Sequence, residues 1–284
     1  MRALALAFVA AAVLATGVGA EPRHVGYPSS IAVLGDSYST GYNSTRPAQD
    51  AKENSWTTGT NPAVASVYLR LLALNPKIRG HNANWAKDGA ASADLLGQAQ
   101  AALSTKPDLV VVAIGGNDFC IDHDTAVATF RGRIARALTV LSRGLPNARI
   151  FVTSVAFSSQ ALQAIATIPA AREASSPGGE CDPHWDANGN PDPKQLAVID
   201  ELLGSYDDAL AAACAQFIHC RYDGGALTKL TAAPSDFSSD WGHPSVTGLA
   251  KLAATEWAVL EQAFADTSPP TSTASVRRLR PHGS

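Results

Sequence analysis

Short segments of strand length alternate with longer amphipathic segments along most of the chain. The longer segments repeat apolar residues every three or four positions, as helices with one buried face do. The predicted strands cover residues 31–34, 78–84, 109–114, 149–155 and 219–222. The predicted helices cover residues 62–72, 92–103, 125–142, 194–217 and 245–264. This alternation predicts an α/β fold with a parallel sheet covered on both faces, so ligand chemistry belongs at the carboxyl ends of the strands.

The pattern weakens between Ser158 and Pro193. A short helix is expected first, followed by a loop rich in Ser, Gly, Asp, Asn and Pro. Long irregular segments of this kind are often functional flaps or are held by disulfides. Residues 186–192 place oxygen side chains at alternate positions, as calcium loops do, but Pro191 and Ala197 stand where an EF-hand needs glycine and glutamate. We therefore expect a solvated turn there and no metal site.

Both ends of the chain depart from this pattern. Arg2 precedes an apolar run that ends in small residues, and residues 1–20 together have the pattern of a cleaved secretory signal. A membrane anchor is the alternative, but the run is shorter than the roughly 20 apolar residues that span a bilayer. Residues 266–284 are rich in Ser, Thr, Pro and Arg without apolar periodicity, so we expect a disordered tail. Residues 21–265 are expected to form one secreted domain.

Composition narrows the class of partner. The net charge is −3 with both signs mixed, so neither nucleic acid nor an acidic membrane surface is indicated, and we expect a monomer without stable membrane insertion. Four cysteines behind an export signal favour disulfides. We favour the pairs Cys120–Cys181 and Cys214–Cys220, with two other pairings open. Zinc binding at His219 and the adjacent cysteine is the weaker alternative, because the chain has no Cys-x-x-Cys motif.

The first candidate for chemistry is Ser37. It follows an apolar predicted strand, within Gly35-Asp36-Ser37-Tyr38-Ser39, and so stands at the carboxyl edge of the sheet. An isolated serine in this position is more often a helix cap or a turn residue. The segment also differs from the Gly-x-Ser-x-Gly elbow of α/β-hydrolases, because Ser39 occupies the last position. The assignment of Ser37 as a nucleophile therefore depends on partners elsewhere in the chain.

Asp240 and His243 are of the residue types that such a serine needs. They are three residues apart before the last predicted helix, so one turn can hold them together. A serine nucleophile needs a base to take its proton, and that imidazole needs a carboxylate to orient it. Asn117 follows the most apolar strand and can aim its amide at a developing oxyanion, with the backbone N–H groups of Ser37 and Gly89 as further donors. Each residue taken alone is more often an ordinary turn residue.

Four segments in this order resemble the signature blocks of the SGNH family, also called GDSL esterases and lipases. The blocks are Gly35-Asp36-Ser37, Gly89 within residues 86–90, Gly115-Gly116-Asn117-Asp118, and Asp240-Trp241-Gly242-His243-Pro244. The resemblance covers residues 30–260 and implies a three-layer, flavodoxin-like α/β/α fold with a mostly five-stranded parallel sheet. Residues 114–120 and 240–245 are similar to the secreted phospholipase B-like and lipase branches. Tyr38 departs from the leucine of the family name, which weakens any inference about substrate.

The resemblance also implies roles for individual residues. Ser37, His243 and Asp240 are expected to form the catalytic triad of a secreted esterase or lipase, with an oxyanion hole from Ser37, Gly89 and Asn117 and no cofactor. The expected substrate is a small-molecule or lipid ester.

Candidates for the acyl pocket are Phe119, Trp185 and Trp241, although aromatic residues are more often plain packing.

Two other functions stay open at this point. The first is a polysaccharide acetylesterase that uses the same catalytic residues. The second, from a different class, is a secreted binding module that keeps the fold without turnover. A binding module is expected to lack the nucleophile, the base or an oxyanion donor, and none of these is missing from the sequence.

Overall fold

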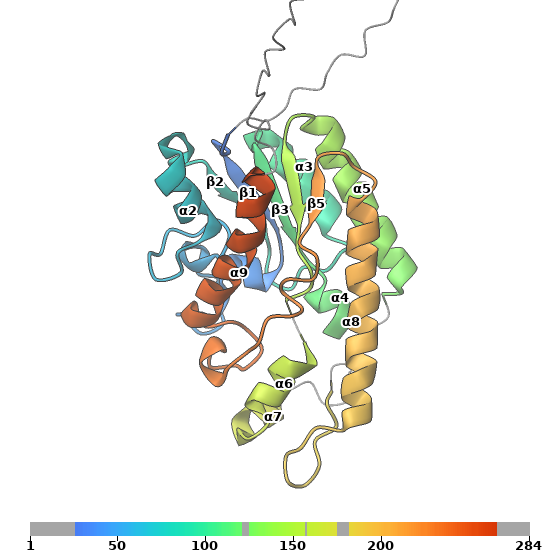
Figure 1. Cartoon of the computed structure of the whole chain (residues 1–284). Coiled ribbons are helices and arrows are strands. Elements are labelled where there is room, and N and C mark those ends of the chain that lie inside the picture. The colour runs from blue at the N-terminus through green and yellow to red at the C-terminus, as the bar shows by residue number, and fades with distance from the viewer. Residues whose placement is uncertain (1–25, 121–124, 157, 175–181, 266–284) are drawn as a thin grey trace, which may run out of the picture.

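The centre of the molecule is a five-stranded parallel sheet (Figure 1). The computed structural model describes residues 26–120, 125–156, 158–174 and 182–265. The strands are β1 Ile31–Gly35, β2 Asn82–Asn84, β3 Leu109–Ala113, β4 Arg149–Val152 and β5 Cys220–Tyr222. Their order across the sheet is β2-β1-β3-β4-β5, and all neighbouring pairs are parallel. The predicted flavodoxin-like α/β fold is confirmed, since this strand order is the doubly wound one.

Helices connect the strands and cover both faces of the sheet. The α-helices are α1 Ser37–Thr40, α2 Val67–Leu74, α3 Leu95–Ala102, α4 Gly116–Cys120, α5 Val127–Gly144, α6 Ser159–Ile165, α7 Pro169–Ala174, α8 Pro193–Cys214 and α9 Val246–Ala265. Short 3₁₀ turns lie at Lys52–Asn54, Pro76–Ile78, Leu103–Thr105 and Pro234–Asp236. Helices α2 and α9 lie on one side of the sheet, and α3, α5 and α8 on the other (Figure 1).

The alternation of side chains along β3 explains how one strand serves both layers. Leu109 and Val111 are buried in the cluster with α2 and α9, whereas Val110 and Val112 are buried in the cluster with α3, α5 and α8. Successive residues of a strand point to opposite faces, so a strand between two helical layers must be apolar at every position. The run of apolar residues in the sequence is the direct result.

The second predicted strand, residues 78–84, begins later than expected. Ile78 ends a 3₁₀ turn, because Pro76 fixes the backbone for a turn and the Asn75 side chain accepts a hydrogen bond from the Lys77 N–H at 3.3 Å. Only Asn82–Asn84 pairs with β1, at the edge of the sheet.

The fourth strand ends earlier than the predicted residues 149–155. Beyond Val152, the N–H groups of Ser154 and Val155 donate to the carboxylates of Asp223, at 2.8 Å, and Asp207, at 3.0 Å. Side chains thus replace the neighbouring strand as acceptors, and the chain turns away from the sheet.

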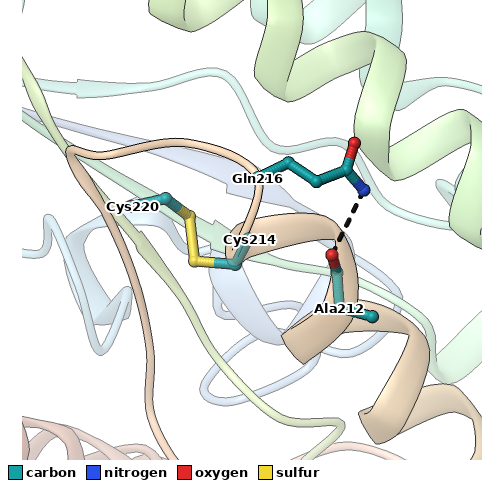
Figure 2. The surroundings of a disulfide bond; sticks show 4 residues. All are labelled: Ala212, Cys214, Gln216 and Cys220. Atoms are coloured by element: carbon teal, nitrogen blue, oxygen red, sulfur yellow. Dashed lines mark hydrogen bonds between the residues drawn. A yellow bond between two sulfur atoms is a disulfide. The ribbon is translucent and has the colours of Figure 1, made fainter.

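A disulfide joins the end of α8 to edge strand β5 (Figure 2). The Cys214–Cys220 pair was predicted and is confirmed, so the sulfur of Cys220 is not a zinc ligand. The other predicted pair, Cys120–Cys181, is not tested, because the side chain of Cys120 and the whole of Cys181 lie outside the described part of the chain, as do the predicted signal, residues 1–20, and the predicted tail, residues 266–284. None of the helices in the described ranges has both the length and the apolar character needed to cross a bilayer.

Candidate active site

The candidate site lies where the strand order reverses. Strand β1 pairs with β2 on one side and β3 on the other, so the connections after β1 and β3 run to opposite faces and leave a crevice at their carboxyl ends. Ser37 follows β1 directly, and Asn117 follows β3 in α4. The topology therefore brings two of the predicted site residues to one edge of the sheet.

Ser37 is held by the turn between β1 and α1. The preceding residue, Asp36, is the N-cap of α1, and its Oδ1 accepts the Tyr38 N–H at 3.0 Å. Gly35 must be glycine, because an added Cβ would lie 2.3 Å from the Ala113 carbonyl oxygen on β3. The Gln98 side chain on α3 both donates to the Gly35 carbonyl, at 2.9 Å, and accepts from its N–H, at 2.7 Å. The backbone at the serine is thus fixed by the sheet, the helix cap and a buried amide.

Asp240 and His243 form a directly hydrogen-bonded pair. The His243 Nδ1 lies 2.7 Å from Asp240 Oδ2, while Asp240 Oδ1 accepts the N–H groups of Gly242, at 3.1 Å, and His243, at 3.0 Å. The Ser238 hydroxyl also donates to Asp240, at 2.9 Å. Partial burial of Asp240 raises its pKa, but these bonds and the charge of His243 outweigh that effect and hold the pKa well below its ordinary value. The carboxylate stays ionised, and Nε2 is left as the imidazole nitrogen for chemistry.

One cavity of about 220 Å³ joins the serine to this pair. Ser37, Asn117, Trp241 and His243 all line it, and Asp240 lies behind the imidazole. Among the described residues no hydrogen bond yet joins the Ser37 hydroxyl to the His243 ring, and such catalytic bonds often tighten only when substrate binds. Three segments that are distant in sequence thus converge on one cavity.

The predicted oxyanion donors lie on two loops that are tied together. Asn117 Nδ2 donates to the Ala90 carbonyl at 2.8 Å, which orients the amide and uses one of its two N–H groups. Gly89, next to Ala90, has a φ of 69°, in the left-handed region that favours glycine. The buried Asp118 carboxylate accepts both the N–H and the hydroxyl of Ser92, which joins the same two loops a second time. Gly89 is not among the residues that line the cavity, and its role as a donor stays a prediction.

The three aromatic residues predicted to contact substrate lie in different places. Trp241 lines the cavity and has a φ of 57°, which is a strained conformation for a bulky residue. Trp185 packs against the core cluster on the side of α8 and is not part of the cavity lining, so its role in binding stays a prediction. The side chain of Phe119 lies outside the described part of the chain.

Several residues of the site were missed by sequence reasoning. Tyr42 packs its ring 4.8 Å from the His243 ring, and Tyr38 donates from its hydroxyl to the Gly242 carbonyl at 3.0 Å. Asp36 lines the cavity beside Ser37. Adjacency to the serine could have suggested Asp36 and Tyr38, whereas Tyr42 carries no local signal.

No group of three or more His, Cys, Asp or Glu side chains is arranged to hold a metal ion in the described ranges. In the loop considered for calcium, Asp186 instead accepts the N–H groups of Asn188 and Asn190, both at 2.8 Å.

We expect Asn117→Ala to raise the barrier to ester hydrolysis by about 3 kcal/mol, a loss of kcat of roughly a hundred- to a thousandfold, because one oriented donor to the oxyanion is removed. Steady-state kinetics on a soluble ester measures this. A matched variant, Asn188→Ala on an exposed turn, is expected to retain full activity. An Asn117→Ala enzyme with unchanged kcat contradicts the role.

Asp36 supplies a prediction about pH. Burial raises its pKa to about 7, and Asp118 adds to the shift, while the Tyr38 N–H and His243 oppose it. The folded chain therefore binds this proton more tightly than the unfolded chain, so Asp36 makes the free energy of unfolding fall as pH rises from about 4 to about 7. Asp36→Asn keeps an acceptor for the Tyr38 N–H and removes the titration.

Urea unfolding of both proteins at pH 5 and pH 8 tests this expectation. The stability of Asp36→Asn relative to the natural chain should increase by about 2.5 kcal/mol between these pH values. A stability difference that does not change with pH contradicts the assignment.

The fold and the site define a doubly wound α/β protein with a serine and a histidine–aspartate pair at its switch point. The chain belongs to the GDSL-like Lipase/Acylhydrolase family, whose sequence profile matches residues 33–251. Among curated proteins, none matches the chain in sequence.

Several solved structures are similar to the chain. A putative GDSL-like lipase from Parabacteroides merdae ATCC 43184 is 17% identical, with a TM-score of 0.54, and the alignment covers 84% of this chain and 98% of that one. A lipase/acylhydrolase from Enterococcus faecalis is 20% identical, with a TM-score of 0.48 and coverage of 82% and 94%. A family 3 carbohydrate esterase from Clostridium thermocellum is 13% identical, with a TM-score of 0.49 and coverage of 84% and 98%. At these identities the similarity is evidence for the fold alone. Of these three structures, the one from Parabacteroides supports it, because its TM-score is above 0.5.

Proposed function

We propose that this member of the family is a secreted serine esterase or lipase that hydrolyses carboxylic esters with apolar acyl groups. The observation that carries the proposal is the His243–Asp240 hydrogen bond of 2.7 Å at a cavity that Ser37 also lines. Family membership makes ester hydrolysis the expected class of reaction. Secretion rests on the sequence of residues 1–20.

The reaction proceeds in two stages. His243 takes the proton of the Ser37 hydroxyl as the oxygen attacks the ester carbonyl, and Asp240 stabilises the imidazolium. The carbonyl oxygen becomes an oxyanion, which the Asn117 amide and the backbone N–H groups of Ser37 and Gly89 stabilise. The tetrahedral intermediate collapses to an acyl-enzyme, and His243 protonates the departing alcohol. Water, activated by His243, then releases the acid and restores the serine.

The lining of the cavity favours apolar acyl groups over acetylated sugars. Away from the catalytic residues, the walls are largely aliphatic: Ala113, Ile114, Val155, Leu162, Ile165, Ala171 and Leu227. A hydrocarbon chain gains free energy by leaving water for such walls, whereas a sugar ring would lose hydrogen bonds there. Polysaccharide acetyl esters are therefore the less favoured substrates.

A covalent probe and a panel of esters test the proposal together. A fluorophosphonate probe should label the purified chain, with the adduct located by mass spectrometry on the peptide that contains Ser37. Hydrolysis of nitrophenyl esters should become faster from acetate to octanoate, and acetylated xylan should be a poor substrate. Absence of labelling favours the silent binding module, and a clear preference for acetylated xylan favours the acetylesterase.

A further inference from the structure

A second apolar hollow adjoins the catalytic cavity. Its far wall is formed by Leu230, Ala232, Phe237 and Leu252, and we call it the side pocket. Its volume is about 110 Å³, roughly half that of the catalytic cavity. The two hollows share wall residues that include Tyr38, Leu162 and Trp241, so they are neighbours and not separate sites.

The shared wall is well defined. The Tyr38 hydroxyl donates to the Gly242 carbonyl, which ties α1 to the loop that carries His243. Trp241 is held in its strained conformation in this loop, with its ring 6.4 Å from that of Phe237 in the side pocket. Strained backbone persists only where its surroundings fix it, and it is often found at binding sites.

The side pocket offers little to a polar ligand. The charged residues among those that line it are Asp236 and Lys251, which form an ion pair with each other at 2.7 Å. The neighbouring wall residues from α6, Ala161, Leu162 and Ile165, are apolar. Hydrocarbon is therefore the chemistry that this pocket fits.

The position of the histidine decides which part of an ester would reach the side pocket. Ser37 and Asn117 line only the catalytic cavity, so the carbonyl group belongs there. His243 also lines only the catalytic cavity, but both of its neighbours, Gly242 and Pro244, line the side pocket, so this pocket adjoins the histidine. Because His243 protonates the departing alcohol, the alcohol oxygen must lie on the histidine side of the carbonyl, away from the Asn117 side.

We propose that the side pocket binds a hydrocarbon chain in the alcohol portion of the ester, while the acyl chain stays in the catalytic cavity. The substrate class is then an ester with hydrocarbon on both sides of the carbonyl, such as a long-chain alcohol ester or a lipid with two chains. This inference rests on the proposed function and deepens it. A single ester can occupy both hollows, because they adjoin each other at Trp241 and Gly242, next to the histidine.

Two matched substitutions separate the two hollows. Ala232→Phe fills only the side pocket from a half-buried loop position, and Ala174→Phe fills only the catalytic cavity from the exposed end of α7. Ala161→Phe, on α6, is a second variant of the side pocket should the first fail to fold. None of these three alanines belongs to the catalytic machinery.

The readout is kcat/KM, measured by titration of released acid, on two series of esters. One series keeps butanoate and lengthens the alcohol from methanol to hexanol, and the other keeps methanol and lengthens the acid from acetate to octanoate. For the natural chain, kcat/KM should rise about fourfold per buried methylene in both series until each hollow is full. Ala232→Phe should abolish the rise along the alcohol series and leave the acid series unchanged, and Ala174→Phe should do the reverse.

The outcomes distinguish this inference from the proposed function. If a folded Ala232→Phe or Ala161→Phe variant keeps the natural dependence on alcohol length, the inference is wrong although the chain is an esterase. If Ala232→Phe weakens the acid series instead, the two chains are exchanged and the inference is again wrong. If the natural chain hydrolyses no ester in a Ser37-dependent way, the proposed function itself fails.

Discussion

Ser37→Ala is expected to lower kcat for ester hydrolysis by about a million-fold, the size of the loss in an unrelated serine protease. In the proposed mechanism the hydroxyl oxygen becomes bonded to the acyl group, so without it no acyl-enzyme can form at this position. Substrate binding should be nearly unchanged, because the walls of the cavity remain. Steady-state kinetics on a nitrophenyl ester, with the concentration of each folded protein measured by absorbance, measures the loss.

The chain provides a matched control for this variant. Ser39 lies in the same short helix, is buried, and has no hydrogen-bond partner for its hydroxyl among the described residues. Ser39→Ala makes the same chemical change two positions along, and it should retain activity within about threefold. Near-natural hydrolysis by Ser37→Ala would remove the basis of the proposed function.

Asp240→Asn is expected to produce the second largest effect, a decrease in kcat of about ten thousand-fold by analogy with the same change in an unrelated serine protease. The Asp240 carboxylate accepts a bond from His243 Nδ1, which leaves Nε2 free to act as a base. An asparagine amide can donate to Nδ1 instead, which stabilises the wrong tautomer and leaves no negative charge beside the imidazolium. The loss should be in kcat, with little change in KM.

Ser238→Ala is a milder change with which the effect of Asp240→Asn on kcat can be compared. It removes one donor to Asp240 Oδ1 but leaves the carboxylate and its bond to His243 in place. Loss of a single hydrogen bond of this kind should lower kcat by less than about tenfold. If Asp240→Asn lowers kcat no more than Ser238→Ala does, the carboxylate is a structural residue and the histidine works without it.

The strands and long helices could be predicted because burial imposes a period on the sequence. Strand β3 is apolar at all of its positions because helices cover both faces, and α5 repeats apolar residues along a single stripe. Strand β2 was harder to place, since it is a polar Asn-Ala-Asn segment at the sheet edge. Its hydrogen bonds with β1, and not its composition, make it a strand.

The motif residues of the site could be named from the sequence, but their surroundings could not. The parallel topology places Ser37 and Asn117 at one edge, which alternation of strands and helices already implies. The ring contact of Tyr42 with His243 depends on the path of an irregular loop, for which no period exists. The wall between the catalytic cavity and the side pocket likewise depends on the conformation of Trp241. The positive φ of this residue could not be predicted, because tryptophan rarely adopts it.

The pair of hydrogen bonds between the Gln98 side chain and the Gly35 backbone bears on how the protein can be engineered. These bonds fix the end of β1, next to Ser37, from α3, which lies on the opposite layer from Leu230, and neither α6 nor α7 contributes to them. Altering residues 159–174 and 230–237 should therefore reshape the range of accepted esters while the reacting serine keeps its place. Much of the proposed substrate-binding wall thus lies in segments apart from those that hold the serine, so libraries aimed at new substrates can start from those two segments.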